Sequence, residues 1–181
     1  MVKLKRAERV VLVNDEDEKV GLMEIEEAHL GVGELHRAIS VLLHDGEGRV
    51  LIQKRSNKKK LWPGFWSNTT CTHRNFRGDH VDWAVRRAKD ELGIVLEKSK
   101  LSLLYVFKYQ ARYDERYSEH EVDSVIVGRY VGEVKPNSEE VAEVLWIDFD
   151  DLKEEVYRNS DRYTPWFKLM LENKKVEKAV T

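Results

Sequence analysis

Short apolar runs separated by polar turns dominate the first third of the chain. Runs of about four to eight residues rich in Val, Ile and Leu predict β-strands, and they occur at Arg9–Asn14, Ala38–His44 and Arg49–Lys54. Between the last two runs, Asp45–Gly48 has the composition of a turn. The pattern therefore predicts a β-hairpin over residues 38–54.

A helical period appears after Gly78. Apolar side chains recur there with the spacing of a single helix face. The residues on this face are Val81, Ala84, Val85, Ala88 and Leu92. Asp79 can serve as the N-cap, and Gly93 stands where a helix commonly ends in a left-handed residue. We expect one helix between these two residues.

The second half of the chain mixes both kinds of element. Further apolar runs predict strands at Leu101–Ala111, Glu119–Val131 and Val144–Ile147. Helices are expected to begin near Asp148 and near Pro165, because proline fits the first turn of a helix. Strands interspersed with helices predict an α+β fold.

The composition is that of a globular protein. Of the 181 residues, 41% are hydrophobic and 35% are charged, which argues against a disordered chain. Because the chain has no repeat, low-complexity stretch or linker, we expect a single domain over residues 1–181, with its core at about 9–172. The charged segment Lys174–Lys178 is expected to be a solvated terminus.

Overall charge and cysteine content limit the cellular setting. The formal net charge is −2, so no global positive field attracts nucleic acid or a membrane. No window approaches the roughly 20 consecutive apolar residues that span a bilayer, and the basic start Met1–Arg6 lacks the apolar core of a signal peptide. The single cysteine, Cys71, fits the reducing cytoplasm. We expect a cytoplasmic monomer or homodimer without nucleic-acid or membrane partners.

Three carboxylates, Glu119, Glu121 and Asp123, share one face of a predicted strand, because side chains alternate with period two. Like charges on one face repel unless water or a cation neutralises them. One interpretation is a solvated outer face. The other is a divalent metal, for which carboxylates and histidines are standard ligands. The candidate histidines are His29, His36 and His73.

Glu91 lies in the last turn of the predicted helix, where the helix dipole disfavours a carboxylate by about 0.3–1 kcal/mol. Arg86 and Arg87, one turn earlier, can relieve this through i,i+4 pairs. The functional alternative is a hard, oxygen-seeking ion such as Mg²⁺, which commonly bridges to a phosphorylated substrate. The residues alone leave both interpretations open.

Five basic residues between Lys54 and Lys60 precede the segment Trp62–Gly64. Such a run is typical of a solvated loop, and basic residues among aromatics also occur in nucleic-acid-binding proteins. Because this run is short and the chain is slightly acidic, a small, doubly charged phosphate group is the better ligand.

Cys71 stands among the polar β-formers of Ser67–His73, with His73 two residues away on the same strand face. A lone cysteine is most often a small buried hydrophobe, but this setting favours a thiol with an altered pKa. Aromatic faces usually mean core packing and can also stabilise a carbocation. The tryptophans that supply such faces are Trp62, Trp66 and Trp166.

Taken together, these features resemble the type 1 isopentenyl-diphosphate isomerases, which have a Nudix fold. The resemblance runs from about Val10 to Met170, and the order and spacing of several blocks make it specific. The blocks are Leu35–Ser40, Trp62–His73, Arg86–Ile94, Glu119–Glu121 and Thr164–Trp166. The resemblance implies a mixed β-sheet sandwiched by helices, in an enzyme of isoprenoid biosynthesis that converts isopentenyl into dimethylallyl diphosphate.

The resemblance also implies two metal sites and an anion site. One divalent ion, of the Zn²⁺ or Mn²⁺ kind, would be bound by His29, His36, His73, Glu119 and Glu121. A second ion, Mg²⁺, would be held by Glu91 and the backbone carbonyl of Cys71 and would bridge to the substrate diphosphate. The positive residues that match those gripping this group are Arg55, Lys59 and Arg87.

By the same resemblance, Glu121, assisted by Tyr109, would protonate the terminal alkene carbon. Trp166 would shield the tertiary cation, and Cys71 would remove a proton on its other side. Two groups are needed because the proton enters and leaves at different carbons. An alkene is also a very weak base, so the donor must be held against it with water excluded.

The chain departs from the Nudix hydrolase signature at three places: Thr72 replaces a glycine, Gly78 replaces a glutamate, and Arg86–Arg87 replaces an Arg-Glu pair. Two carboxylates are thereby lost. This counts against pyrophosphohydrolysis, which relies on a denser acidic cluster. Two alternatives nevertheless stay open. One is a Nudix pyrophosphohydrolase acting on a nucleoside or other diphosphate, which would not require Cys71. The other is a catalytically silent relative that binds a diphosphate or a metal.

The chain also departs from the isomerases. Ile25 stands where a lysine usually precedes the first metal histidine by four residues, and Lys58 or Lys60 is the candidate substitute. Arg74 follows His73 in place of the usual proline.

Overall fold

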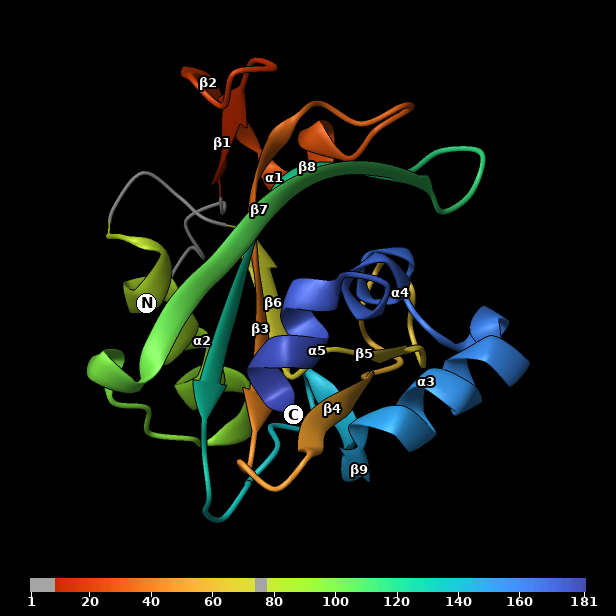
Figure 1. The fold of residues 1–181 in the computed structure, drawn as a ribbon. Coiled ribbons are helices and arrows are strands. Elements are labelled where there is room, and N and C mark those ends of the chain that lie inside the picture. The colour runs from red at the N-terminus through yellow and green to blue at the C-terminus, as the bar shows by residue number, and fades with distance from the viewer. Residues whose placement is uncertain (1–8, 74–77) are drawn as a thin grey trace, which may run out of the picture.

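Strand β3 (His36–His44) lies at the centre of a nine-stranded mixed sheet (Figure 1). The computed structural model describes residues 9–73 and 78–181. One edge of β3 pairs in parallel with β8 (Ser118–Arg129) from its first residue to its last. Most of β3 is buried, as expected for a strand covered on both faces.

The other edge of β3 is shared by three partners. They are β1 (Arg9–Val13), β6 (Thr70–His73) and β4 (Arg49–Arg55). β1 pairs at the first residue of β3, β6 in its middle, and β4 at its last two residues. The predicted hairpin around Asp45–Gly48 is thereby confirmed.

The remaining strands extend the sheet outward. They are β2 (Lys19–Glu24) beside β1, β7 (Leu101–Arg112) beside β8, and both β5 (Trp66–Ser67) and β9 (Val141–Asp148) beside β4. The strands predicted in the second half of the chain are therefore confirmed, with boundaries that differ by up to three residues. Strand β2 had no counterpart in the sequence-based prediction.

Helices cover both faces of the sheet. Because side chains alternate along β3, Ile39, Val41 and Leu43 pack with α2 (His80–Leu92), whereas Leu42 faces the opposite core. The helices of that opposite face are α3 (Phe149–Arg158), α4 (Pro165–Leu171) and α5 (Lys174–Val180). The short helical segments are α1 (Ile25–Ala28), η1 (Lys98–Lys100) and η2 (Ser160–Arg162). Figure 1 shows α2 on one side of β6 and α5 on the other.

The ends of α2 are fixed as the sequence predicts. The Asp79 side chain accepts a hydrogen bond from the backbone N–H of Asp82, and the Asp82 side chain accepts one from Asp79, which forms a capping box. Gly93 ends the helix with φ 66°, a left-handed conformation that glycine adopts without strain.

The prediction of a solvated segment at Lys174–Lys178 was right for the lysines, which are exposed, but wrong for Val176, which is buried in a helix. These residues begin α5, in which Val176 and Val180 are 0% and 2% exposed and belong to the core. The two valines are four positions apart, so they share one face of the helix while the lysines face solvent.

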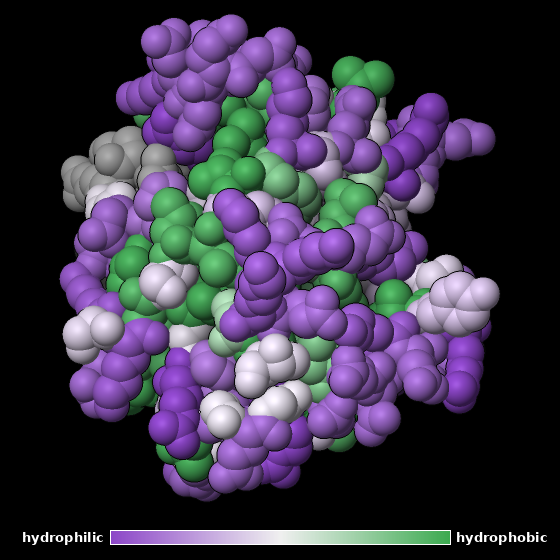
Figure 2. All heavy atoms as spheres, in the orientation of Figure 1, coloured by the Kyte–Doolittle hydropathy of each residue, from purple (hydrophilic) through white to green (hydrophobic). Residues whose placement is uncertain are grey.

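The outer surface is mainly polar. The face in Figure 2 is largely hydrophilic, with smaller hydrophobic areas, and the exposed hydrophobic side chains include Leu103 and Val106 of β7. Among the described residues, no helix is both long and apolar enough to cross a bilayer.

Candidate active site

One face of the sheet carries a group of buried polar side chains. Residues paired in register point to the same face, so adjacent strands bring their side chains together there. They are His36 and Ser40 of β3, Glu121 and Asp123 of β8, and Cys71 and His73 of β6, with Glu119 following the same alternation. Each of the three carboxylates is at most 6% exposed. The interpretation of these residues as a solvated outer face was therefore wrong.

Four side chains of this face and His29, which follows α1, form a cluster of potential metal ligands. One ligand atom from each lies within 4.8 Å of all the others, and the residues are His29, His36, His73, Glu119 and Glu121. His29 Nε2 is 2.8 Å from Glu119 Oε2, and His73 Nε2 is 3.2 Å from Glu121 Oε1. The structure thus brings together all five residues predicted for the first metal site.

Two of these histidines are oriented as metal ligands are. Nδ1 of His29 is hydrogen-bonded to the carbonyl of Ile25, and Nδ1 of His36 to that of Glu34. Each Nε2 then faces the carboxylates, and within the described part of the chain the buried Nε2 of His36 has no hydrogen-bond partner. A backbone carbonyl on one nitrogen and a metal on the other is the usual arrangement of metal-bound histidine. The donor set therefore fits a divalent cation.

The charges of this cluster depend on one another. Burial disfavours a protonated His73, but hydrogen bonds to Glu119 and Glu121 outweigh it and raise the pKa of His73 to about 9. Burial also disfavours an ionised Glu121, but His36 and His73 hold the pKa of that carboxyl well below its usual range. In the metal-free protein, an imidazolium thus supplies positive charge that a divalent ion would otherwise bring.

Aromatic side chains enclose the site beside Glu121. Tyr109 of β7 donates a 2.5 Å hydrogen bond to Glu121 Oε2, and burial together with the Glu121 charge raises the pKa of Tyr109 well above its usual value. The Trp166 ring lies 6.2 Å from that of Tyr109 and 5.3 Å from that of Trp62. Tyr109 therefore contacts both Glu121, its partner in the protonation that the resemblance implies, and Trp166, the residue that would shield the cation.

Asn68 orients Trp166 and was missed by the sequence analysis as a functional residue. Its buried Oδ1 accepts a 3.0 Å hydrogen bond from Trp166 Nε1, and its Nδ2 donates to the carbonyls of Val41 and Thr70. The indole lies 98 positions away in the chain, so no local pattern links the two residues. The only signal was the position of Asn68 inside the block Trp62–His73.

Cys71 shares the sheet face of Glu121 and is separated from it by β3. Its sulfur accepts a 3.6 Å hydrogen bond from Arg55 Nη1. Burial raises the pKa of the thiol to about 12, and the charge of Arg55 opposes this shift. The altered pKa expected from the sequence is thus an upward shift, which favours the protonated thiol.

Glu91 lies against the opposite face of β6. Thr70, which alternates with Cys71, donates its hydroxyl to the Glu91 carboxylate. Glu91 is 1% exposed, and its Oε1 is 2.7 Å from Arg87 Nη2 and 3.4 Å from Lys59 Nζ. The helical pair expected between Arg87 and Glu91 is present. Two cations therefore neutralise this carboxylate.

Glu140, which precedes β9, binds the same two cations. It pairs with Lys59 Nζ and lies 3.1 Å from Arg87 Nη2. Burial disfavours its ionised form, but Lys59 and Arg87 lower the pKa of Glu140. No pattern in the sequence separated Glu140 from neighbouring exposed acids. The structure thus brings Lys59 and Arg87 together, whereas Arg55, the third predicted anion ligand, is 8% exposed and points toward Cys71.

Ile25, which replaces the lysine of the isomerases, opens α1. Of the two candidate substitutes, Lys60 lies beside this position, with its Nζ 2.7 Å from Glu26 Oε1. Lys58 instead pairs with an acid that precedes β9. The geometry therefore favours Lys60 as the cation near Ile25. Arg74 lies outside the described residues.

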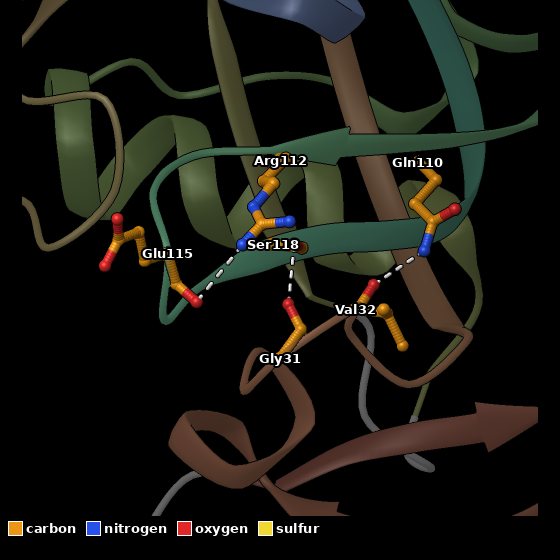
Figure 3. A pocket seen from close by; sticks show the side chains of 6 residues that line it. All are labelled: Gly31, Val32, Gln110, Arg112, Glu115 and Ser118. Carbon is orange, nitrogen blue, oxygen red and sulfur yellow. Dashed lines mark hydrogen bonds between the residues drawn. The ribbon is translucent and has the colours of Figure 1, made fainter.

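The segment after His29 is tied to the β7–β8 hairpin beside a surface pocket of about 350 Å³ (Figure 3). Gln110 Nε2 donates to the carbonyl of Val32, and Ser118 Oγ donates to that of Gly31, both at 2.7 Å. None of the five clustered metal-ligand candidates lines this pocket. These contacts support the cluster by holding the His29 segment against the hairpin that carries the two glutamates.

Comparison with known proteins identifies the class. Residues 34–167 match the NUDIX domain. The crystal structure of DR0079 from Deinococcus radiodurans is similar, with a TM-score of 0.72 over 96% of this chain and 100% of that one, at 16% identity. A MutT NUDIX hydrolase from Burkholderia pseudomallei has a TM-score of 0.60 over 82% of this chain and 99% of that one, at 23% identity. These structural similarities bear on the fold alone, and with the domain match they make the chain a Nudix protein.

Relatives that match nearly the whole chain narrow the class of Nudix proteins to one enzyme family. Isopentenyl-diphosphate Delta-isomerase 1 from Photorhabdus laumondii is 37% identical over 161 residues, which cover 89% of this chain and 91% of that protein. Isopentenyl-diphosphate Delta-isomerase from Cereibacter sphaeroides is 40% identical over 158 residues, covering 83% and 85%. The chain belongs to the isopentenyl-diphosphate Delta-isomerase family, as its sequence blocks indicated.

Proposed function

We propose that this protein converts isopentenyl diphosphate into dimethylallyl diphosphate by protonation and deprotonation through a tertiary carbocation. One observation carries the proposal beyond family membership. The sheet face that holds Glu121 and its Tyr109 partner also holds Cys71, across the width of β3. Moving a double bond needs a proton donor at one carbon and an acceptor at another, so two such groups on one face of the sheet suit this reaction.

The donor is Glu121 acting with Tyr109. The lowered pKa of Glu121 keeps its carboxylate ionised, whereas the raised pKa of Tyr109 keeps its hydroxyl protonated and directed at Glu121. The proton that this pair delivers therefore starts on Tyr109 and passes through Glu121. Their hydrogen bond holds the carboxyl against Tyr109, whose ring lies 6.2 Å from that of Trp166. Protonation of the terminal alkene carbon then places positive charge near an aromatic face, which attracts cations and offers no nucleophile.

Cys71, on the other side of β3 from Glu121, is the proton acceptor. Because burial favours the protonated thiol, Cys71 must lose its proton to solvent before it accepts one from the substrate carbon. The Tyr109–Glu121 pair regains the proton that it delivered from solvent, so each turnover is balanced. Arg55 is the residue that opposes the burial of this negative charge most strongly.

Two divalent ions fit the described residues. The cluster of His29, His36, His73, Glu119 and Glu121 would hold Zn²⁺ or Mn²⁺, and such an ion would neutralise the buried carboxylates and fix Glu121 in place. Mg²⁺ suits the second position because it prefers oxygen ligands. Its donors would be Glu91 and the backbone carbonyl of Cys71, and the nearby Gln53 Oε1 is a buried oxygen without a hydrogen-bond partner in the described part of the chain.

The diphosphate group is bound by Lys59 and Arg87, with Arg55 nearby. The first two converge on Glu91 and Glu140, so a phosphate with Mg²⁺ can replace these contacts with charge-assisted hydrogen bonds of its own. We further propose that the enzyme acts in the cytoplasm as a monomer or homodimer, without a nucleic-acid or membrane partner.

The test is isomerisation in D₂O. Purified protein is incubated with isopentenyl diphosphate and Mg²⁺, and the products are followed by NMR. The wild type should form deuterated dimethylallyl diphosphate, while Cys71→Ala and Glu121→Gln should lose about 10²–10⁴-fold in rate. Glu143→Gln, which changes an exposed glutamate of β9, serves as the matched control and should retain the rate. Release of phosphate, or undiminished isomerisation by Cys71→Ala, would refute the proposal.

A further inference from the structure

Arg55 closes the loop between β4 and β5 at its base. Its backbone N–H donates to the carbonyl of Phe65 at 2.8 Å, and its own carbonyl accepts from the N–H of Gly64 at 3.0 Å. The enclosed residues, 56–64, include the lysine run and Trp62. Both ends of the loop are therefore held by one residue.

The Arg55 side chain also fills this loop. Its Nε donates to the carbonyl of Trp62 at 3.1 Å, and its Nη2 donates to that of Leu61 at 2.9 Å. Trp62 has φ 47°, in the left-handed region that side-chain-bearing residues rarely adopt. A backbone in this conformation persists only where its surroundings hold it. The guanidinium group, which donates along a fixed fork, binds both carbonyls of this turn.

The conformation of this turn determines where the Trp62 ring lies. That ring is perpendicular to Trp166, at 5.3 Å and 88°, and both rings are buried. The Arg55 guanidinium carbon lies 5.4 Å from the centre of the Trp166 ring, and its Nη1 is 3.6 Å from Cys71 Sγ. The Arg55 side chain thus contacts the Leu61–Trp62 turn, the Trp166 ring and the Cys71 thiol.

We infer that Arg55 is a positioning residue: by binding the Leu61–Trp62 turn, it fixes the Trp62–Trp166 pair beside Tyr109, the hydrogen-bond partner of Glu121. This goes beyond its role near the diphosphate, and its kinetic consequence rests on the proposed isomerase function. Lys59, on the same loop, instead pairs with Glu91 and Glu140. The loop therefore carries one cation that fixes the two tryptophans, Arg55, and another that lies at the proposed anion site, Lys59.

The first test needs no substrate. Two perpendicular tryptophans at this separation contribute to the near-ultraviolet circular dichroism spectrum, and Trp62→Phe and Trp166→Phe identify their shared component. Arg55→Lys and Arg55→Met should both lose this component in the ligand-free protein while keeping the far-ultraviolet spectrum. Lys59→Met, the matched control on the same loop, should keep it. Should Arg55→Met fail to fold, the spectrum of Arg55→Lys decides the test, because lysine retains the positive charge but cannot bind both carbonyls as the forked guanidinium does.

Kinetics provide the second test. Arg55→Lys should lower kcat by about 10²-fold, the effect expected of a misplaced reacting group, whereas Lys59→Met should mainly raise KM. If the ligand-free spectra of both Arg55 variants match the wild type and only KM changes, Arg55 is a phosphate contact and the inference is overturned. If the wild type proves inactive, the proposed function fails, and the spectra still decide the role of Arg55.

Discussion

A single buried amide fixes the orientation of the Trp166 indole. Asn68 is fully buried, its Oδ1 accepts from Trp166 Nε1, and both hydrogens of its Nδ2 are directed at backbone carbonyls. A buried amide with all of its hydrogen bonds made contributes little net stability, but removing it leaves its partners unsatisfied. The effect of losing Asn68 should therefore exceed that of losing an ordinary surface amide.

We expect Asn68→Ala to lower the free energy of unfolding by about 3 kcal/mol, because an indole N–H and two carbonyls lose their partner. Urea denaturation followed by fluorescence measures this. Asn57→Ala, at an exposed position of the loop after β4, is the matched control and should stay within about 0.5 kcal/mol of the wild type. Equal stability of the two variants would contradict the assigned role of Asn68.

At the scale of residues, the sequence predicted which side chains share a strand face better than it predicted which residues they contact. The alternation of Glu119, Glu121 and Asp123 placed them correctly on one face, because strand geometry is local. The burial of these carboxylates could not be predicted in the same way, because it depends on which other parts of the chain cover that face. The hydrogen bond between Asn68 and Trp166 likewise joins segments far apart in the sequence, so no period or spacing could predict it.

At the scale of elements, helices with complete capping signals were predictable and short ones were not. The capping box at Asp79 and the left-handed Gly93 mark the two ends of α2, and both signals come from residues next to the helix in the sequence. Helix α5 has only seven residues, too few to be stable alone. It exists because Val176 and Val180 are buried against the core, which the lysine-rich composition obscured.

The stability of α5 can be tested with Val176→Ala. Removing two buried methyl groups should lower the free energy of unfolding by about 2 kcal/mol, as measured from urea denaturation curves. Lys178→Ala, on the exposed side of the same helix, should change it by less than about 0.5 kcal/mol. If the two variants were equally stable, α5 would be a loosely attached terminus, as its composition first suggested.

At the scale of the whole molecule, the topology of the sheet creates the metal cluster. β3 pairs with β6 on one edge and in parallel with β8 on the other, so His36 meets His73 from one side and Glu121 from the opposite side. His29 joins from the segment before β3. Local sequence patterns predicted the strands but not their order, because parallel pairing across most of the chain is a property of the assembled sheet. Only the family resemblance connected these five residues in advance.

This assembly predicts that metal binding will release a proton. In the metal-free protein the pKa of His73 is about 9, so at pH 7 the ring binds a proton that a metal-bound imidazole cannot retain. The metal-bound state therefore binds fewer protons than the free state, and affinity must rise with pH. Below the pKa of His73, we expect the Mn²⁺ association constant of chelator-treated protein to increase about tenfold per pH unit.

Calorimetry in buffers of different ionisation enthalpy measures the released proton directly, and about one per Mn²⁺ is expected at pH 7. His73→Gln should bind Mn²⁺ more weakly and release no such proton, since it lacks the titrating ring. His120→Gln, which changes a histidine on the other face of β8, should behave as the wild type. Proton release near zero in the wild type would mean that Glu119 and Glu121 do not hold His73 protonated, and that the charge of the metal-free cluster is balanced in another way.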